Sequence, residues 1–544
     1  MARVAVQLTN FTGGELSPRL DGRNDLAKYS SGCSTLENLI VYPHGSAARR
    51  PGTNFVAAVK DSTKKTRLIP FEFSTTQTYM LEFGNQYIRF YKDNGQILSS
   101  GSAYEISTPY LEAELFDLKF AQSADVMYIC HPNHEVEKLS RTGHTSWSLT
   151  DVDFTKGPFL DPNITTTTLT PSSASTGSRN ITASATTGIN GGSGFLATDV
   201  GRQIHFNSGY ATITSITSTT VVVATVTTAF TNANAITNWY LGAFSDTTGH
   251  PSCVTFFEQR LVFAATLNNP QTVYFSKSGD YENMDANLGG TIADDDAIIY
   301  TIASNQVNAI RFMTATRTLI IGTAGGEFAV SGGGTDSAIT PTNILIKKQS
   351  NHGAANVDAI AVGNATLFLQ RARRKIRELA YNFDVDGYVA PDMTILAEHI
   401  TEGGLTQVAY QQEPNQIIYA TREDGELVGL TYQREQQVTA WHRHIFGGRF
   451  GIATITVSDY ANIANGTKLT LTKSDGTTVD FNSTTGTAGT NEFKTETNNN
   501  TTATNLKTAI NAHANFTATV SSAVVTITET AHEATGYLTI KSFD

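Results

Sequence analysis

Two pairs of closely spaced histidines could in principle bind a metal. His131 and His134 stand three positions apart in the segment HPNH, and His442 and His444 alternate in WHRH. A zinc site needs further Cys, His or carboxylate ligands at characteristic spacings, and neither pair is accompanied by them. We therefore expect ordinary surface or core histidines and no metal site.

A run of three carboxylates, Asp294, Asp295 and Asp296, could bind a hard cation through its oxygens. The consecutive spacing lacks the alternating D-x-D-x-D-G pattern that wraps a calcium ion. The sequence therefore favours a solvated acidic turn. The functional alternative is that oligomer symmetry repeats the turn as an acidic ring around a channel, where like-charge repulsion would keep a polyanion such as DNA moving.

The dense cationic segment of this acidic chain is RARRKIR, which contains Arg371, Arg373, Arg374, Lys375 and Arg377. If the segment is a strand, Arg371, Arg373, Lys375 and Arg377 share one face, because alternate side chains of a strand point the same way. Such a face could contact DNA phosphates. Pairing with acidic residues of a neighbouring subunit is the favoured alternative.

Motifs typical of the common enzyme classes are absent from the sequence. It has no Gly-Lys pair, hence no phosphate-binding loop, and no G-x-S-x-G nucleophile elbow. Gly332 to Gly334 lack the third glycine and the helix of a dinucleotide fingerprint. Carboxylate pairs for glycoside hydrolysis cannot be assigned, because opposing acids would come from distant segments. We expect no enzyme activity, no catalytic residues and no cofactor.

Composition favours strands over helices. Charged residues make up only 16% of the 544 residues, and Thr, Ser, Asn and Gly fill the gap. The net charge of −11 argues against a general nucleic-acid coat. Three distant cysteines, Cys33, Cys130 and Cys253, predict free and mostly buried thiols in a reducing cytoplasm. No run of eighteen apolar residues occurs, so no stable membrane insertion is expected.

Short β runs with turn signals recur along the chain. Six units can be counted, with first strands near residues 67, 118, 254, 310, 359 and 406. Removing a Thr-rich insertion of roughly 85 residues from the longest step restores a period of about 50, the length of one four-stranded propeller blade. We predict a mainly β fold: a β-propeller-like repeat of short four-stranded sheets with a small helical N-terminal platform and inserted β-rich domains.

Composition shifts divide the chain into five predicted domains. In the first, spacing allows one or two short helices capped by Asn24 and carrying Leu26, Tyr29, Leu36 and Leu39. In the last, TATNLKTAINAHA predicts an amphipathic helix among strands. The domains are an N-terminal platform (1–65), the first propeller blades (66–161), an inserted β-sandwich or hairpin domain (162–243), further blades (244–449) and a Thr-rich α+β or β-sandwich decoration (450–544).

A more specific signal lies in the first sixty residues. The stretch FTGGELSPRLDGRNDLAKYSSGCSTLENLIVYPHGSAARRPGTNFVA resembles the start of the tail tubular protein B, or tail nozzle, family of short-tailed bacteriophages. Further resemblance lies in HPSCVTFFEQRLVFAATLNNPQTVYFSKSGDYENM and LTYQREQQVTAWHRH, and covers most of residues 1–445. In similar proteins more propeller and tip sequence follows WHRH, so we expect the chain to be part of a longer protein.

The resemblance implies a homo-oligomeric ring, expected to be a hexamer, below the portal and the tail adaptor ring. Each subunit would contain a β-propeller, and viral DNA would pass through the lumen without sequence-specific binding. Contact with tail fibres or spikes, assembly in the host cytoplasm and a place in the virion tail are also implied. Arg49, Arg50, Pro51 and Gly52 become candidates for adaptor or intersubunit contact, and the charges of 371–377 and 294–296 for channel or intersubunit contact.

The leading hypothesis is therefore a non-enzymatic virion structural protein that extends the tail, closes its channel before infection and opens for genome ejection. The alternative is a receptor-binding or glycan-binding tail adhesin, motivated by the repeat and the two Thr-rich insertions. Aromatic platforms would support it, but Trp147, Trp239 and Trp441 are few and scattered. A propeller hydrolase ranks last, since it needs converging carboxylates that sequence spacing does not show.

Overall fold

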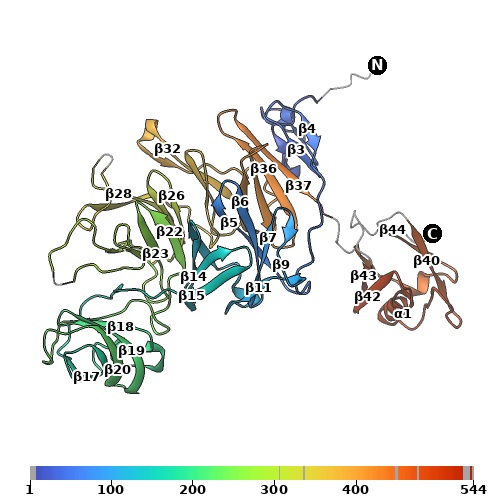
Figure 1. Ribbon diagram of the computed structural model, residues 1–544. Coiled ribbons are helices and arrows are strands. Elements are labelled where there is room, and N and C mark those ends of the chain that lie inside the picture. The colour runs from blue at the N-terminus through green and yellow to red at the C-terminus, as the bar shows by residue number, and fades with distance from the viewer. Residues whose placement is uncertain are drawn as a thin grey trace.

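The centre of the protein is a set of six antiparallel sheets that follow one another along the chain. The computed structural model describes residues 8–288, 290–304, 307–334, 337–446, 451–473, 477–530 and 539–541. We number the six sheets blades 1 to 6 in chain order, and Figure 1 shows them from blue (blade 1) to orange (blade 6). The predicted mainly β, propeller-like repeat of small four-stranded sheets is confirmed.

Blades 1 and 2 precede the large insertion. In blade 1 the strand order is β11-β7-β6-β5, with β8 (Gly95–Gln96) paired to β7, and in blade 2 it is β12-β13-β14-β15. The bounds are β5 Arg67–Ser74, β6 Gln77–Gly84, β7 Tyr87–Lys92, β11 Glu105–Ser107, β12 Lys119–Ser123, β13 Val126–His131, β14 His134–Gly143 and β15 Ser146–Asp151.

Blades 3 to 6 are simple antiparallel meanders of four consecutive strands each. Blade 3 comprises β22 Cys253–Phe257, β23 Arg260–Ala264, β24 Thr272–Phe275 and β25 Ile298–Thr301, and blade 4 comprises β26 Ile310–Ala315, β27 Leu319–Thr323, β28 Gly326–Gly332 and β29 Ile344–Ser350. Blade 5 comprises β30 Ile360–Val362, β31 Ala365–Leu369, β32 Ile376–Asn382 and β33 Gly387–Val389, and blade 6 comprises β34 Leu405–Gln411, β35 Ile417–Arg422, β36 Leu427–Gln433 and β37 Val438–His444.

Residue patterns explain why these segments form packed sheets. In the edge strand β5, Arg67, Ile69 and Phe71 are buried and alternate with exposed residues, so one face points inward. Pro70 is tolerated there because an edge strand has free backbone positions. The middle strands β23 and β24 are buried at every residue, because neighbouring blades cover both faces of that sheet.

Apolar clusters join consecutive blades, whereas the seam between blade 6 and blade 1 is more polar. The five clusters join blades 1 and 2, 2 and 3, 3 and 4, 4 and 5, and 5 and 6. Across the remaining seam, Nε2 of Gln407 donates to the carbonyl of Leu68 at 3.2 Å, and Lys65 lies 3.4 Å from Glu423. Blade 6 therefore lies against blade 1.

A small ionic cluster joins blades 1, 2 and 5. The Asp358 carboxylate, just before β30, lies 2.9 Å from Nζ of Lys119 and 3.6 Å from Nη2 of Arg67. Lys119 and Arg67 begin the first strands of blades 2 and 1, and both side chains are buried. Arg67 also donates to the carbonyls of Leu115 and Leu118. One carboxylate therefore faces two buried cations.

The N-terminal region forms a module on blade 6 rather than the predicted helices. Its described residues contain strands and two three-residue 3-10 turns, and Asn24 caps neither turn. Leu36 and Val41 are buried against Val438 and Ala440 of β37, and this tertiary burial overrides the helical spacing. The elements are β1 Gly14–Glu15, β2 Gly32–Cys33, β3 Leu39–Val41 and β4 Ala47–Arg49, with 3-10 turns at Pro18–Leu20 and Tyr29–Ser31.

The Thr-rich insertion between β15 and β22 is a separate six-stranded antiparallel sheet with its own apolar core (Figure 1, green). Its ends lie close together, since the Asn163 N–H donates to the Trp239 carbonyl at 3.0 Å. In sheet order the strands are β16 Leu169–Pro171, β17 Gly177–Ala183, β20 Val221–Thr228, β19 Gly209–Ser218, β18 Gln203–Phe206 and β21 Trp239–Leu241.

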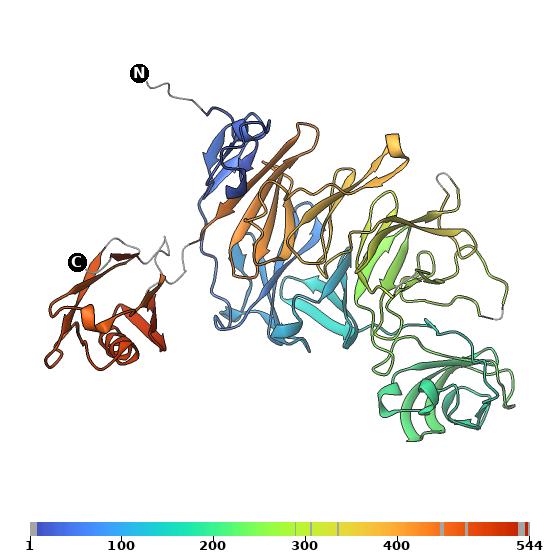
Figure 2. The same ribbon diagram turned by 180° about the vertical axis from the view of Figure 1, so that it is seen from behind.

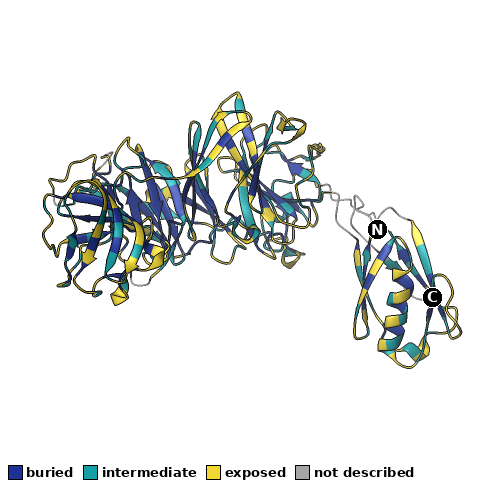
Figure 3. Ribbon diagram, turned by 60° about the horizontal axis from the view of Figure 1, so that its bottom comes forward, coloured by how far each residue is buried: buried dark blue, intermediate teal, exposed yellow. Residues whose placement is uncertain are grey.

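The C-terminal module combines two sheets and the predicted helix. Helix α1 (Asn499–Asn511) begins at an Asn498 side chain that accepts the Thr501 N–H, and its face with Leu506 and Ile510 is buried. Figure 2 shows the module apart from the blades, and Figure 3 shows its own buried interior. Its strands are β38 Ile452–Thr456, β39 Lys468–Thr472, β40 Thr478–Thr484, β41 Glu492–Lys494, β42 Phe516–Ser521, β43 Val524–Glu529 and β44 Thr539–Lys541.

Two sequence expectations about cysteines and membranes can be compared with the structure. Cys130 and Cys253 are buried free thiols and Cys33 is a half-buried one, as predicted. Burial raises the pKa of the Cys253 thiol to about 11, so it is protonated near neutral pH. Among the described residues, no helix is both long and apolar enough to span a bilayer.

Candidate functional site

The cationic segment 371–377 lies mainly in the loop between β31 and β32 of blade 5. The Lys375 carbonyl accepts the Gln370 N–H at 2.9 Å, and Arg373 adopts a left-handed backbone with φ of 60°. Only Arg377 lies within β32. The predicted strand face shared by Arg371, Arg373, Lys375 and Arg377 is therefore wrong, because the chain reverses direction inside the segment.

Three of these cations are bound within the chain. Nη1 of Arg373 lies 3.0 Å from the Glu423 carboxylate, and Nζ of Lys375 lies 2.8 Å from Oδ2 of Asp392. Arg377 donates to the Ala390 carbonyl at 2.7 Å. Their charges stabilise the hairpin and its contact with blade 6, which leaves Arg371 and Arg374 for contacts outside the chain.

Arg371 and Arg374 are the exposed arginines of this loop. Arg374 has a long 3.9 Å contact with Glu402, and both side chains are at least half exposed. Arg371 has no ion-pair partner among the residues that the structure describes. Exposed ion pairs contribute little to stability, so these two guanidinium groups can pair with an incoming anion at small cost.

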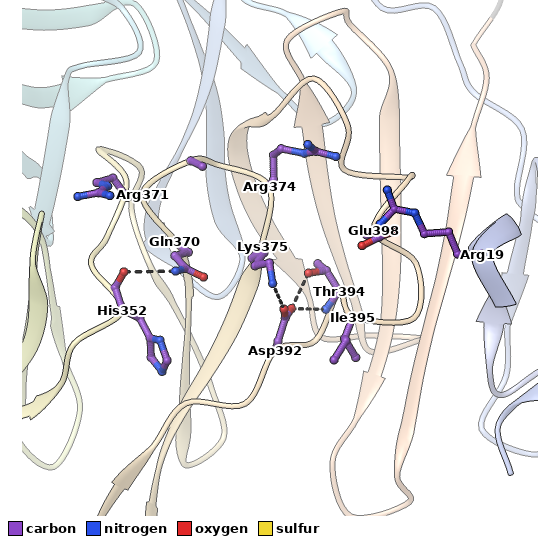
Figure 4. A pocket seen from close by; sticks show the side chains of 11 residues that line it. Arg19, His352, Gln370, Arg371, Arg374, Lys375, Asp392, Thr394, Ile395 and Glu398 are labelled. Carbon is purple, nitrogen blue, oxygen red and sulfur yellow. Dashed lines mark hydrogen bonds and ion pairs between the residues drawn. The ribbon is translucent and has the colours of Figure 1, made fainter. Parts of the chain in front are cut away.

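A pocket of about 380 Å³ lies beside these arginines (Figure 4). Arg371, Arg374 and Lys375 line it from blade 5, and Arg19 lines it from the N-terminal module. Glu398 pairs with Arg19 at 2.6 Å on its rim. Because four cations face two carboxylates, Asp392 and Glu398, the pocket favours carboxylates or phosphates from a partner.

The basic corner of the N-terminal module contains one structural and one free arginine. Arg50 donates to Oδ1 of Asn38 at 3.1 Å and to the Ile445 carbonyl at 3.2 Å, and its guanidinium stacks on Phe446. Arg49 is exposed and has no side-chain partner within the described part of the chain. Pro51 and Gly52 are also exposed. Of the two arginines, Arg49 alone is free for an external contact.

The acidic run of blade 3 is fixed from inside by Arg260. This guanidinium donates to the carbonyls of Asp294 and Asp296 at 2.7 Å each. Asp296 is buried, accepts the Ala293 N–H at 2.8 Å and pairs with Lys277 at 2.8 Å, so the predicted solvated turn is wrong for Asp296. Asp294 and Asp295 are exposed, as predicted.

The identity of the protein follows from comparison with a known family. The sequence model described as bacteriophage nozzle protein matches residues 250–542, which is more than half of the chain and spans blades 3 to 6 and the C-terminal module. The chain belongs to the bacteriophage nozzle protein family. It is a structural component of a phage tail.

Similar solved structures are distant from this nozzle-family chain. YCF48 bound to D1 peptide matches at 9% identity over 70% of this chain and 98% of that chain, with a TM-score of 0.30. The Cps50 (Swd1) β-propeller domain of Myceliophteria thermophila matches at 9% identity over 68% and 100%, with a TM-score of 0.29. None of the curated proteins matches. The assignment of the fold therefore rests on the sheets of this chain and not on these structures.

The histidine pairs of the nozzle-family chain differ from each other in environment. His442 and His444 are core residues of blade 6, one of the two expected outcomes. His131 is buried and His134 half-buried, but both lie next to Glu114, a third potential metal ligand that sequence spacing did not show. Nothing in the local sequence marks Glu114, because the chain fold alone brings it to the histidines.

A groove of about 1160 Å³ at the seam between blades 6 and 1 was also missed from the sequence. Leu68, Met80 and Val408 line its apolar part, and Leu68 is 52% exposed. Lys65 and Glu423 lie on its polar side. The alternating sequence patterns of strands such as β5 and β34 do not predict that the outer faces of these strands meet across a seam.

Proposed function

We propose that this protein is a non-enzymatic subunit of a ring in the tail nozzle, below the head-to-tail adaptor, whose channel carries the viral genome during ejection. The family match over residues 250–542 is the observation that carries the proposal. The ring contains six copies, assembles in the host cytoplasm and contacts the tail fibres or spikes. DNA passes through the lumen without sequence-specific binding.

The arrangement of charges supports a ring built through intersubunit ion pairs. A ring requires two different surfaces on each subunit that complement each other. The pocket beside Arg371 and Arg374 is one cationic surface, and the net charge of −11 means that acidic surface is abundant elsewhere. Complementary charge fixes the register of neighbouring copies, so we assign Arg371 and Arg374 to this contact.

The exposed acids of blade 3 suit a different role. Asp294 and Asp295 project from a turn that Arg260 and Lys277 hold rigid. Repeated by ring symmetry, such a turn would form an acidic rim that repels phosphates and prevents DNA from adhering. Arg49 faces outward from the N-terminal module and is the proposed contact to the adaptor ring.

The test of the ring is the mass and symmetry of the purified protein with and without its adaptor. Mass photometry should show a hexamer, and electron-microscope class averages should show a sixfold ring with an open lumen that caps the adaptor. A stable contact of this kind buries on the order of 2,000 Å² or more. A persistent monomer or trimer that ignores the adaptor would overturn the proposal.

Charge-reversed variants test the assigned contact. The double variant Arg371→Glu with Arg374→Glu should shift the protein from rings to monomers, because it places acids against an acidic neighbour. Lys64→Glu is the control, since Lys64 is an exposed cation elsewhere on the chain. If the double variant forms rings as well as the control does, the contact lies elsewhere even if the ring itself is confirmed.

The adhesin alternative rests on the two peripheral modules. Each has its own apolar core, so each could present a binding surface without disturbing the blades. A glycan array and a host-cell binding assay should compare the full chain with a variant in which residues 164–238 are replaced by a short linker. Specific binding that disappears with the insertion would favour the adhesin.

A further inference from the structure

Glu114, His131 and His134 form a cluster at the junction of blades 1 and 2. Glu114 ends the 3-10 turn Glu112–Glu114 in the connection from β11 to β12. His131 ends β13 and His134 begins β14, so the two rings flank the tight turn between these strands. The fold therefore brings a carboxylate of one connection next to two imidazoles of another.

The three side chains have the geometry of a metal ligand set. One ligand atom from each lies within 4.8 Å of the other two, and Nε2 of His134 is 3.0 Å from Oε2 of Glu114. Ligands of a tetrahedral zinc ion at about 2.1 Å lie about 3.4 Å from one another. Small movements of the side chains would therefore bring all three around one ion.

Neighbouring groups hold the ligands in place. The Leu111 N–H donates to Oε2 of Glu114 at 2.8 Å, which orients the carboxylate. The Tyr110 ring packs edge-on against the His134 ring with a centroid distance of 5.2 Å, and both Tyr110 and His131 are buried. Such outer contacts orient metal ligands and strengthen binding.

Two existing interactions oppose metal binding. Nε2 of His134 and Oε2 of Glu114 already share a hydrogen bond at 3.0 Å, which the ion would replace. The Asn133 N–H donates to Nδ1 of His131 at 3.2 Å. A metal-bound imidazole either uses Nδ1 as its ligand atom or carries a proton there, so this bond is lost in both cases. The bond is long and lies within a turn, and the ion would replace it with a stronger link between the same turn and Glu114.

We propose that Glu114, His131 and His134 bind one divalent transition-metal ion of the zinc class. The ion joins the connection between blades 1 and 2 to the β13–β14 turn, and three protein ligands leave a further position for water. Protons compete with the ion for the imidazoles, because each ring must offer a free lone pair to the metal. The Pro132 carbonyl of the turn also accepts the His250 N–H, so the ion fixes a junction that reaches the segment before blade 3.

The full chain, treated with a chelator and then titrated with Co²⁺ or Zn²⁺, tests the proposal. We expect the visible absorption bands of four-coordinate Co²⁺ to saturate at one ion per chain, and Zn²⁺ to raise the midpoint of thermal unfolding. Glu114→Gln keeps an oxygen for the Leu111 N–H and should remain folded, yet lose at least about tenfold in affinity. His134→Ala should lose the Zn²⁺-dependent rise.

His44→Ala is the control, because His44 is exposed and lies in the N-terminal module. It should bind one ion with unchanged affinity. The change in unfolding midpoint on adding Zn²⁺ is compared within each variant, so a lower starting stability does not affect the result. Absence of binding at one equivalent, or equal affinity in His134→Ala and the wild type, would overturn the proposal.

Discussion

The Nε2 atom of His444 lies 2.8 Å from the Nδ1 atom of His442 in the interior of blade 6. The Thr431 hydroxyl donates to the Val41 carbonyl, so its oxygen accepts the Nε2 proton of His442 at 3.2 Å. Nδ1 of His442 then accepts from His444, whose own Nδ1 is buried and has no hydrogen-bond partner among the residues that the structure describes. This chain of hydrogen bonds requires a neutral His442 ring, and burial of Nδ1 of His444 disfavours a proton there. It also links blade 6 to the N-terminal module.

The histidine pair makes the protein sensitive to acid. Burial lowers the pKa of His442 to about 3 and that of His444 to about 4, whereas both titrate near pH 6.5 when unfolded. The contribution of the two neutral rings to the free energy of unfolding is therefore fully present above about pH 6.5. It is lost as the pH falls towards the pKa values of the folded state. At about pH 5 each ring should lower the free energy of unfolding by up to roughly 2 kcal/mol.

Denaturant titrations at about pH 7.5 and pH 5 measure this loss. His444→Gln removes one of the two titrating rings and should shrink the difference between the two pH values. The control His44→Gln alters an exposed ring and should leave the difference unchanged. An unchanged difference in His444→Gln would contradict the assignment of the pH dependence to this pair.

The blades could be predicted from the sequence and the N-terminal module could not. Strands such as β5 carry their own signal, because inward and outward residues alternate along a few consecutive positions. In the N-terminal module, the spacing of Leu36 and Leu39 suits a helix, but Leu36 is buried against Val438 and Ala440 in a structure without one. These partners lie far away in the sequence, so no local pattern reports the burial that decides the structure.

Glu15 should be essential for attachment of the N-terminal module to blade 6. Its carboxylate accepts the Leu36 N–H at 2.7 Å and lies 2.9 Å from Nε2 of His399 and 3.0 Å from Nε of Arg443. Burial by itself raises the pKa of Glu15, but these hydrogen bonds outweigh it and the pKa is lowered. The stabilisation is present above the unfolded pKa and lost as the pH falls below it.

Glu15→Gln should lower the free energy of unfolding by roughly 3 kcal/mol, because Arg443 loses its main buried partner. Limited proteolysis should then cleave the linker after Gly52 faster than in the wild type. Glu37→Gln is the matched control, since Glu37 contacts the same arginine at 3.3 Å from a more exposed position. Equal protease resistance in the two variants would show that Glu15 is not the critical partner.

The candidate site shows the same limit of prediction from sequence. The cationic composition of 371–377 was visible, but its geometry depends on a chain reversal after Leu369, where β31 ends. The partners that neutralise Arg373 and Lys375 are Glu423 and Asp392, which belong to other elements. The tertiary structure therefore decides which cations remain free for assembly. It also decides the position of Glu114 beside His131 and His134.

Asp358 should contribute to closure of the propeller, because it is the carboxylate that faces Arg67 and Lys119. Asp358→Asn would remove the nearest carboxylate from two buried cations, with Asp117 still acting on Arg67. It should lower the free energy of unfolding by roughly 2 kcal/mol, less than for a fully buried pair because Asp358 is half-exposed. Denaturant titration measures the change. Asp25→Asn removes an exposed pair with Arg23 and should leave the free energy of unfolding nearly unchanged. Similar losses in both variants would argue against a role for Asp358 in closure.

Arg49 and Arg50 are adjacent in sequence but should respond in opposite ways to substitution. Arg50→Ala removes the hydrogen bonds to Asn38 and to the Ile445 carbonyl and the stacking on Phe446, and should lower the free energy of unfolding by about 1–2 kcal/mol. Arg49→Ala removes an exposed side chain without a described partner and should change it by about 0.5 kcal/mol or less.

The two substitutions should have the opposite relative effects when binding to the adaptor ring is measured instead of stability. Arg49→Ala should weaken capture by the adaptor ring, because the guanidinium of Arg49 is exposed and has no side-chain partner among the described residues. A shift in the binding midpoint measured by surface plasmon resonance would report this. Arg50→Ala, assayed at a temperature where it is folded, should bind like the wild type because Arg50 points into the contact with blade 6. If Arg49→Ala binds the adaptor as well as the wild type does, the N-terminal module meets the adaptor through another surface.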